Sequence, residues 1–336
     1  MKKILVIDSI YEKHFSDLQI EKDILHGYDL DLLHVKSLMD IPISLLSQAD
    51  GIILWGCASS IDFNSKIIDM LEKCKIIVKA AVGFENIDID YARFKNIPVY
   101  NIPDYGTEEV ADHAMALLLS LNRKITLLNS QVKENIWEWI NAKEIPRLRG
   151  KSLGIIGFGR IGKALALRAK PFGLKIGFYD PIVNSGIDKS LGVFRYENIE
   201  NLLSESDFIS IHCSLNQSSY HLINTNNIEC IKKGAVLINT ARGAIVSTSA
   251  LKLLLEKEII SFAGLDVLEN EIISFAGLDV LENEPNVDLD IVNHKSVVVT
   301  PHSAFFSSEA FLEMRQKSSK LLLDFYNGKC LRDKVN

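Results

Sequence analysis

The sequence predicts an α/β protein with two parallel-sheet domains, the larger of them a doubly wound sheet covered by helices on both faces. Its 336 residues exceed the size of a typical single domain, and each half is long enough to bury its own core. Short apolar runs alternate with helical stretches along almost the whole chain, as they do where crossover helices join parallel strands. A hydrophobic content of 47% with 24% charged residues is typical of a globular protein.

The first hundred residues predict a compact parallel α/β unit. The expected strands are residues 4–7, 31–34, 49–54, 75–80 and 99–101, and the expected helices lie near residues 13–25 and 61–74. The strands are short and apolar, as is usual for strands of a parallel sheet that are buried on both faces.

Residues 107–128 give the strongest helical pattern in the chain. Thr107 is expected to cap the N-terminus of this helix, and Glu108 and Glu109 suit the positive end of its dipole. The apolar positions are too dense for a helix with a single buried side. We therefore expect the helix to cross between domains or subunits.

Residues 151–180 contain a glycine-rich motif at a strand-to-helix junction. A strand expected at 151–156 leads into Gly157-Phe158-Gly159-Arg160-Ile161-Gly162, and helical character continues as far as Pro171. The next expected strand, residues 175–179, ends at Asp180. The glycine pattern alone is weak evidence, but between a strand and a helix and followed by an acid it is typical of a Rossmann-type dinucleotide-binding fold.

Each position of this motif has a physical role in binding a dinucleotide. Gly157 permits the tight turn, Gly159 lets the backbone approach a pyrophosphate, and Gly162 lets helix and strand pack closely. The N–H groups and positive dipole at the start of the helix would hold the phosphates. Asp180 would accept hydrogen bonds from the adenosine ribose and repel a 2′-phosphate, which predicts NAD rather than NADP. The alternative is a glycine-rich loop in an α/β protein that binds no nucleotide.

The alternation of strands and helices resumes beyond Asp180. The expected strands are residues 208–212 and 235–239, and the expected helices are residues 198–203, 225–231, 248–257 and 308–326. The last helix follows a loop that begins at Pro301, and it could return to the first domain.

Charge and cysteine content narrow the classes of function. The net charge of −6, without a basic block, argues against a nucleic-acid partner. No apolar run is long enough to span a membrane, and the short run at the N-terminus is interpreted as a strand rather than a signal peptide. Five scattered cysteines without a Cys/His cluster predict reduced thiols and no metal site, as in a cytoplasmic protein.

One segment of the chain is repeated without change. Residues 258–270 and residues 271–283 both read EIISFAGLDVLEN. An identical tandem copy of this length is not chance, and the unit is too short and too few for a repeat architecture. We interpret it as a recent in-frame duplication or as a sequence error. Only one copy can form a given strand of the sheet.

The motifs, taken in order, resemble the D-isomer-specific 2-hydroxyacid dehydrogenase family over nearly the whole chain. The segments that carry the resemblance are GFENIDID (83–90), NIP (101–103), EEVADHA (108–114), GFGRIG (157–162), INTARG (238–243), GLDVLENEP (277–285) and TPH (300–302). Residues 159–181 and the segment TPHSAFFSSEA are most similar to the C-terminal-binding-protein branch, whose members keep this fold and also act as NADH-responsive corepressors in animals.

The resemblance implies both an architecture and a reaction. It implies a Rossmann-type NAD-binding domain at residues 103–302, and a smaller flavodoxin-like substrate-binding domain made of residues 1–102 and 303–336. A cleft between them would close on the ligand, and two chains would pair as a homodimer through the helix from Thr107. The implied reaction is reversible hydride transfer between NADH and a 2-oxoacid, which gives the D-2-hydroxyacid.

The alternative function, drawn from the corepressor branch, is an NADH-sensing binding protein without catalysis. An intact catalytic set argues against it, as does the absence of a long disordered tail after Tyr326.

Three residues of the family motifs fit the implied chemistry by their type. Arg242 can hold the carboxylate and carbonyl of a 2-oxoacid with its forked guanidinium. His302 can donate a proton during reduction and take it back during oxidation, and Glu284 can orient its imidazole. Each alone has an ordinary explanation, as a surface arginine, a loop histidine or a turn glutamate, but together they predict a catalytic site. The histidines expected to be structural or solvent-facing are His113, His212, His221 and His294.

Further residues would bind substrate or cofactor by resemblance. The backbone N–H groups of Val82 and Gly83 would hold the substrate carboxylate, and Asp279 would hold the nicotinamide carboxamide. Lys79 stands where the family often has an arginine, and lysine cannot make the planar fork. Phe305 stands where the branch has a tryptophan, which predicts an aromatic wall for an apolar substrate side chain. The remaining expected cofactor-binding residues are Val110, Arg160, Ile161, Cys213, Thr240 and Ala241.

The repeat leaves two of these assignments open. Glu284 lies 284 − 242 = 42 residues after Arg242, whereas Glu271 lies 271 − 242 = 29 residues after it, which is close to the usual family spacing. Glu271 is followed by isoleucine, however, where the family has proline. Asp266 and Asp279 form the corresponding pair for the nicotinamide contact. If the second copy forms the strand, the extra residues lie away from the ligand, so we expect the roles to fall to Asp279 and Glu284.

We predict that Glu284→Gln abolishes most turnover of a 2-oxoacid with NADH, because the imidazole of His302 then loses its charged partner. Glu271→Gln should leave turnover unchanged. Steady-state NADH oxidation by both variants checks this prediction, and loss of turnover only in Glu271→Gln would contradict it.

Overall fold

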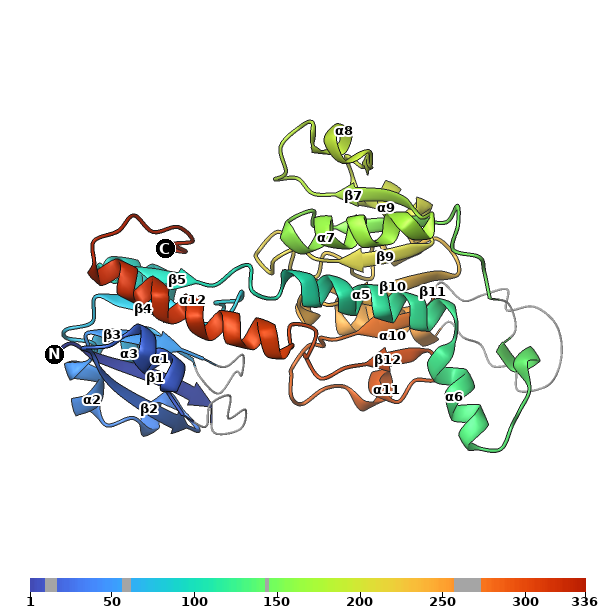
Figure 1. The fold of residues 1–336 in the computed structure, drawn as a ribbon. Coiled ribbons are helices and arrows are strands. Elements are labelled where there is room, and N and C mark those ends of the chain that lie inside the picture. The colour runs from blue at the N-terminus through green and yellow to red at the C-terminus, as the bar shows by residue number, and fades with distance from the viewer. Residues whose placement is uncertain (10–16, 56–61, 143–144, 257–272) are drawn as a thin grey trace. The chain divides into compact units, whose positions relative to one another are not determined.

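The computed structural model describes residues 1–9, 17–55, 62–142, 145–256 and 273–336, and Figure 1 shows its elements. The chain divides into two compact units. The first consists of Met1–Gly106 together with Phe306–Asn336, and the second of Thr107–Phe305. Each unit has its own parallel sheet and its own buried apolar core.

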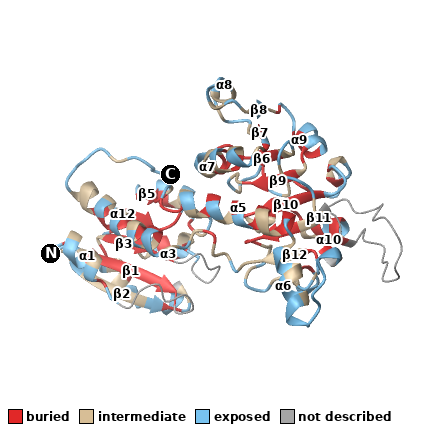
Figure 2. Ribbon diagram, turned by 45° about the vertical axis from the view of Figure 1, so that its right-hand side comes forward, coloured by how far each residue is buried: buried red, intermediate tan, exposed pale blue. Residues whose placement is uncertain are grey.

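The first unit contains a five-stranded parallel sheet with the order β2-β1-β3-β4-β5. The strands are β1 (Lys3–Ser9), β2 (Asp29–Val35), β3 (Gly51–Leu54), β4 (Ile76–Lys79) and β5 (Val99–Asn101). This is the flavodoxin-like order, so the expected fold class is confirmed for this unit. The strands other than β2 are almost entirely buried, as Figure 2 shows. β2 and β5 are the two edge strands, and β5 is covered by C-terminal residues, since the N–H of Val335 donates to the carbonyl of Val99 at 2.9 Å.

Helices cover both faces of this sheet. On one face α2 (Ile43–Gln48), α3 (Ser65–Asp69) and α4 (Ile89–Phe94) supply apolar side chains to the core. On the other face α1 (Gln19–Ile24) packs against α12 (Ser308–Tyr326). Arg315 of α12 donates two hydrogen bonds to the buried carboxylate of Glu21, at 2.7 and 2.5 Å. This bidentate pair joins the C-terminal helix to the first unit.

The second unit contains a seven-stranded parallel sheet with the order β12-β11-β10-β9-β6-β7-β8. The strands are β6 (Ser152–Ile156), β7 (Lys175–Tyr179), β8 (Phe194–Arg195), β9 (Phe208–Ile211), β10 (Ala235–Asn239), β11 (Ile273–Leu278) and β12 (Val297–Val299). The direction in which successive strands are added reverses beside β6, which is the topological switch point of a Rossmann-type sheet. The expected doubly wound fold is therefore confirmed.

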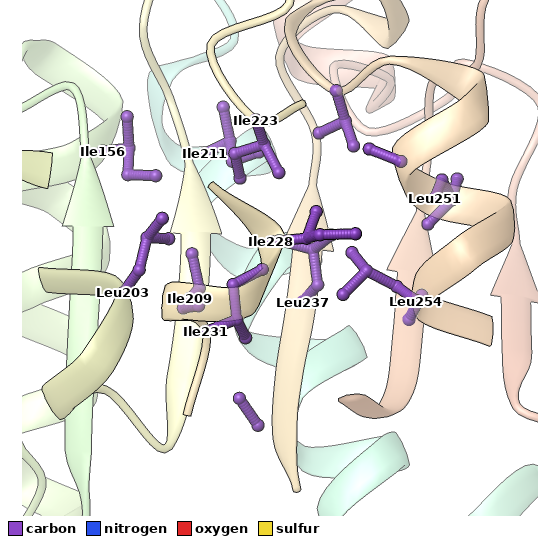
Figure 3. Close-up of a cluster of buried hydrophobic side chains, with 14 of the residues drawn as sticks. Ile156, Leu203, Ile209, Ile211, Ile223, Ile228, Ile231, Leu237, Leu251 and Leu254 are labelled. Atoms are coloured by element: carbon purple, nitrogen blue, oxygen red, sulfur yellow. The ribbon is translucent and has the colours of Figure 1, made fainter. Parts of the chain in front are cut away.

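Two apolar cores hold this sheet between layers of helices. α5 (Thr107–Asn122) and α7 (Arg160–Ala169) pack together over one face. α9 (Ile199–Glu205) and α10 (Thr248–Glu256) pack over the other, and Figure 3 shows Ile209, Leu237 and Leu251 as members of the buried cluster there. The remaining helices of this unit are α6 (Ile125–Lys133), α8 (Ile187–Leu191) and α11 (Leu289–Val292), and the short 3₁₀ helices are η2 (Trp139–Ala142), η3 (Lys170–Phe172), η4 (Ile228–Cys230) and η5 (Gly243–Ile245).

The structure corrects three of the local predictions. The helix expected at 107–128 ends at Asn122, because Lys124 adopts a left-handed conformation with φ of 54°, and α6 then begins in a new direction. Thr107 is the first helical residue rather than a cap, and its buried hydroxyl has no hydrogen-bond partner among the described residues. The helix expected at 225–231 is a turn followed by η4. The predicted helix at 13–25 falls partly, and the first copy of the repeat wholly, outside the described residues.

Two features are absent from the described residues. None of the helices there is both long and apolar enough to cross a membrane. Within the same residues, no group of three or more His, Cys, Asp or Glu side chains is arranged to hold a metal ion.

Asp207 stabilises the amino edge of the larger sheet, where the strands begin. Its carboxylate accepts hydrogen bonds from the N–H of Ser152 at 2.8 Å and from the ammonium of Lys232 at 2.8 Å, and Lys151 lies at 3.3 Å. Burial raises the pKa of Asp207, but these lysines and the groups of Ser152 together lower it to about 2. The folded chain therefore stabilises the charged form of the Asp207 carboxyl group relative to its neutral form.

We predict that Asp207→Asn lowers the free energy of unfolding at pH 7. Because the pKa of Asp207 is lower in the folded chain than its usual 3.8, this stabilisation is complete above about pH 4 and is lost as the pH falls towards 2. Urea denaturation of both proteins at pH 7 and pH 3 should show a smaller difference at pH 3. Asp104→Asn, which removes an exposed partner of Lys317, is the control. An equal difference at both pH values would contradict the prediction.

Candidate active site

The glycine motif forms a tight loop between β6 and α7. Gly157 has φ of 89°, and a side chain there would collide with the backbone of Cys213, so only glycine fits. A side chain on Gly162 would collide with the carbonyl oxygen of Gly157, which explains the close packing of helix and strand. Gly159 is exposed and has open space around it, where a pyrophosphate could approach the N-terminus of α7. Arg160 and Ile161 form the first turn of that helix.

Asp180 lies directly after β7 and contacts this loop. One carboxylate oxygen accepts a hydrogen bond from the N–H of Phe158 at 2.7 Å, and the other accepts from Ile182 at 2.8 Å and from Val183 at 3.1 Å. Asp180 therefore fixes the glycine loop in addition to its expected contact with ribose. This structural role was not predicted from the sequence.

Arg242 lies in a turn after β10 that is held by a buried asparagine. Asn239, with 1% of its surface exposed, accepts a hydrogen bond from the N–H of Ala241 at 3.0 Å and donates one to the carbonyl of Arg242 at 2.9 Å. Thr240 and Ala241 occupy the same turn, at the carboxyl end of the strand. The carboxyl ends of parallel strands are where such sheets bind their ligands.

Glu284 and His302 form a hydrogen-bonded pair beside this turn. Nδ1 of His302 and Oε2 of Glu284 are 2.8 Å apart. A carboxylate only accepts, so Nδ1 carries the proton and Nε2 remains for another group. Burial raises the pKa of Glu284, but the hydrogen bond and charge of His302, the N–H of Leu281 and the charge of Arg242 outweigh burial and lower it. Glu284 is therefore negatively charged when it pairs with His302.

Asp279 determines how the chain turns at His302. Its carboxylate accepts hydrogen bonds from the hydroxyl of Thr300 at 2.6 Å, from the N–H of Ser303 at 2.9 Å and from the N–H of Ala304 at 2.9 Å. Its backbone carbonyl accepts the N–H of His302 at 2.9 Å, and His302 has a left-handed φ of 52°. Only 1% of the Asp279 side chain is exposed. The expected contact with the nicotinamide carboxamide stays a prediction.

The second copy of the repeat forms the strand next to these residues. β11 (Ile273–Leu278) belongs to that copy, and it pairs in parallel with β10 and β12. Asp279 and Glu284 follow β11 directly and make the contacts given above. Asp266 and Glu271 lie outside the described residues.

The other predicted site residues lie in several elements. Val110 is buried in α5, and Cys213 follows β9, where burial raises the pKa of its thiol to about 11. Phe305 follows Ala304 at the end of the second unit. In the first unit Lys79 ends β4 with 1% of its surface exposed, and the turn that follows contains Val82 and Gly83. The carbonyl of Val82 accepts a hydrogen bond from Asn101 at 2.7 Å.

Two histidines expected to be structural or solvent-facing contact the candidate site. Nε2 of His113 lies 2.9 Å from the hydroxyl of Thr300, and because that hydroxyl donates to Asp279, His113 must donate to it. Nε2 of His221 lies 2.8 Å from Oε1 of Glu282. These partners were missed, although His113, Thr300 and Glu282 all stand inside motifs noted in the sequence.

Comparisons with known proteins identify a class and then a family. A Rossmann-type sheet with this glycine loop is the fold of an NAD-binding oxidoreductase, and the family model for "D-isomer specific 2-hydroxyacid dehydrogenase, NAD binding domain" matches residues 115–304. A glyoxylate reductase of Thermococcus litoralis is 38% identical over 279 residues, covering 81% of this chain and 80% of that protein. A glyoxylate reductase of Korarchaeum cryptofilum is 36% identical over 276 residues, covering 81% of this chain and 79% of that protein.

A solved structure is similar to this chain over almost its full length. The D-lactate dehydrogenase from Aquifex aeolicus, described as complexed with NAD and lactic acid, is 27% identical with a TM-score of 0.83, covering 97% of this chain and 96% of that one. The chain belongs to the D-isomer-specific 2-hydroxyacid dehydrogenase family. The resemblance to this family is confirmed, whereas the assignment to the C-terminal-binding-protein branch stays a prediction.

We predict that Gly159→Ala weakens NADH binding about tenfold or more without lowering the thermal midpoint, because its new methyl group meets no protein atom but lies where the pyrophosphate would approach. Gly157→Ala should also destabilise the fold, by about 1–3 kcal/mol, since its backbone is left-handed. Fluorescence titration with NADH and thermal denaturation measure the two effects. Unchanged NADH affinity in Gly159→Ala would show that the cofactor does not use this loop.

Proposed function

We propose that this protein is an NAD-dependent D-2-hydroxyacid dehydrogenase that interconverts a small 2-oxoacid and its D-2-hydroxyacid. The observation that carries the proposal is the His302–Glu284 pair, whose Nδ1 and Oε2 atoms are 2.8 Å apart. Both residues follow strands of the same Rossmann-type sheet that carries the glycine loop. When bound, NADH supplies the hydride for reduction of the ketone. The polar residues of the chain then have only to bind, orient and protonate the substrate.

The roles of the three residues follow from their chemistry. Arg242 binds the substrate carboxylate and polarises the carbonyl with its guanidinium. His302 holds a proton on Nε2 and transfers it to the developing alkoxide during reduction. Glu284 keeps Nδ1–H in place and stabilises the charged imidazole, so the proton returns to His302 in the reverse direction. In the oxidation direction the neutral imidazole takes that proton from the hydroxyl.

The two units divide these tasks. We propose that the second unit is the NAD-binding domain, with Asp180, Val110, Cys213, Thr240 and the glycine loop as cofactor-binding groups. The family match to residues 115–304 supports this assignment. The first unit is proposed as the substrate-binding domain, with Lys79 and the backbone N–H groups of Val82 and Gly83 as the groups that bind the acid.

The substrate class is proposed from the relatives and from one aromatic side chain. The relatives named above are glyoxylate reductases, and the solved neighbour is a D-lactate dehydrogenase, which supports an acid with a small side chain. Phe305 adds an aromatic wall that would favour apolar side chains over polar ones. The acidic net charge of −6 fits a small-molecule substrate rather than a nucleic acid.

A homodimer is proposed from an exposed apolar surface beside α6. Trp137, Trp139 and Ile140 are 86%, 82% and 64% exposed, which is unusual for such large side chains on one short segment. Pairing with a second copy of the chain would cover them, and sedimentation velocity measures it. A cytoplasmic location is proposed as well, since Cys74, Cys213, Cys230 and Cys330 are all free thiols.

The alternative of a non-catalytic NADH sensor is not favoured. The relatives are reductases and dehydrogenases by name, and Arg242, Glu284 and His302 are all present.

We predict that the purified protein oxidises NADH with glyoxylate and pyruvate, and with branched and aromatic 2-oxoacids to a degree set by side-chain size. Phe305→Ala should raise KM more for the bulky acids than for pyruvate, because it removes the aromatic wall. Steady-state kinetics across the panel provide the measurement. An equal rise in KM for all acids would refute the wall, and the absence of turnover with tight NADH binding would refute the dehydrogenase.

A further inference from the structure

A second histidine–glutamate pair lies two residues along the chain from the catalytic glutamate. Oε1 of Glu282 is 2.8 Å from Nε2 of His221. Oε2 of Glu282 accepts the N–H of Thr248 at 2.7 Å and also the hydroxyl of Thr248. Thr248 is the first residue of α10, so Glu282 connects the 279–285 loop to the start of that helix.

Glu282 is charged in this setting. Burial raises its pKa, but the two hydrogen bonds from Thr248 and the contact with His221 outweigh burial and lower the pKa. A carboxylate only accepts hydrogen bonds, so His221 donates through Nε2. The side chain of Glu282 thus accepts hydrogen bonds from both His221 and Thr248. The Glu282 side chain is only 17% exposed, so these bonds are shielded from competition with water.

The same histidine is bonded to the Arg242 turn where that turn continues into η5 (Gly243–Ile245). The backbone N–H of His221 donates to the carbonyl of Ala244 at 2.8 Å, and His221 has a left-handed φ of 49°. Two residues on, the N–H of Ile223 donates to the carbonyl of Ile245 at 3.1 Å. The ring of Tyr220 stacks on the imidazole, with the ring centres 4.0 Å apart. His221 therefore joins the Arg242 turn on one side and Glu282 on the other.

The Arg242 turn and the Glu284 loop also touch backbone to backbone. A side chain on Gly243 would collide with the carbonyl of Leu281 and the N–H of Glu282, so the two segments meet where no side chain separates them. Leu281 in turn donates its N–H to Glu284 at 2.7 Å. A shift of Glu282 would thus reach both Arg242 and Glu284.

We propose that His221 and Glu282 are positioning residues that fix Arg242 relative to the Glu284–His302 pair. Neither is proposed to touch the substrate. The inference rests on the proposed function, because it gives a task to the geometry that Arg242, Glu284 and His302 require. Small displacements of reacting groups reduce rates strongly, so this pair controls turnover more than it controls cofactor binding.

The test uses the full-length protein with NADH and compares three variants. His221→Ala and Glu282→Gln should each lower kcat for glyoxylate or pyruvate about tenfold or more, with NADH affinity within about twofold of the wild type. His221→Gln keeps a donor near the position of Nε2 and should recover much of the loss. Glu282→Gln keeps the shape of the side chain, and so serves if His221→Ala does not fold.

A matched control lies on α10, the helix whose first residue contacts Glu282. Lys252 of α10 pairs with Asp288 at 2.8 Å, and its side chain is as exposed as that of His221, at 32% against 33%. Lys252→Ala should leave kcat and KM unchanged. A fall in thermal midpoint without a change in kcat for His221→Ala and Glu282→Gln would show a merely structural pair and overturn the proposal.

Binding of oxamate, an unreactive analogue of pyruvate, separates this proposal from the proposed function. The NADH complex of His221→Ala should bind oxamate about tenfold more weakly than the wild type, because Arg242 is displaced. If the wild type binds oxamate but turns over no 2-oxoacid, the dehydrogenase fails, and oxamate affinity still decides the positioning role. Unchanged oxamate affinity in His221→Ala overturns that role. A wild type that neither binds oxamate nor turns over any acid overturns both.

Discussion

The hydrogen bonds to the buried carboxylate of Asp279 are the interaction on which the rest of the candidate site depends. A carboxylate removed from water must be satisfied by hydrogen bonds, and here Thr300, Ser303 and Ala304 provide the donors. This requirement folds the chain after β12 around the end of β11. His302 is held in the middle of that turn with a left-handed backbone, where its ring reaches Glu284 on the loop that Asp279 begins.

The residues of the site lie after adjacent parallel strands, which makes their spacing a property of the sheet. Arg242 follows β10, Asp279 and Glu284 follow β11, and His302 follows β12. β10 is fully buried and β12 is half-buried between the apolar cores, and close packing of this kind holds side chains at the carboxyl ends of the strands at a defined separation. Hydrogen bonds within the loops that follow these strands, and the close contact of Gly243 with Leu281, complete the arrangement.

Local patterns in the sequence predicted most of this arrangement. The apolar strands and the glycine motif are visible because each signal lies within a few neighbouring residues, whereas Arg242, Glu284 and His302 were expected from the resemblance to the family. The partners of His221 and His113 lie 61 and 187 residues away along the chain, so no local pattern could pair them. The end of α5 was also missed, because apolar residues continue past Lys124 and hide a break made by its backbone.

The position of the repeat has a consequence for variants made within it. β11 and Asp279 belong to the second copy, whereas Glu284 follows the end of that copy at Asn283. Asp266→Asn and Asp279→Asn make the same change in the same thirteen-residue sequence, so a difference between the two variants reports the position in the fold and not the local sequence.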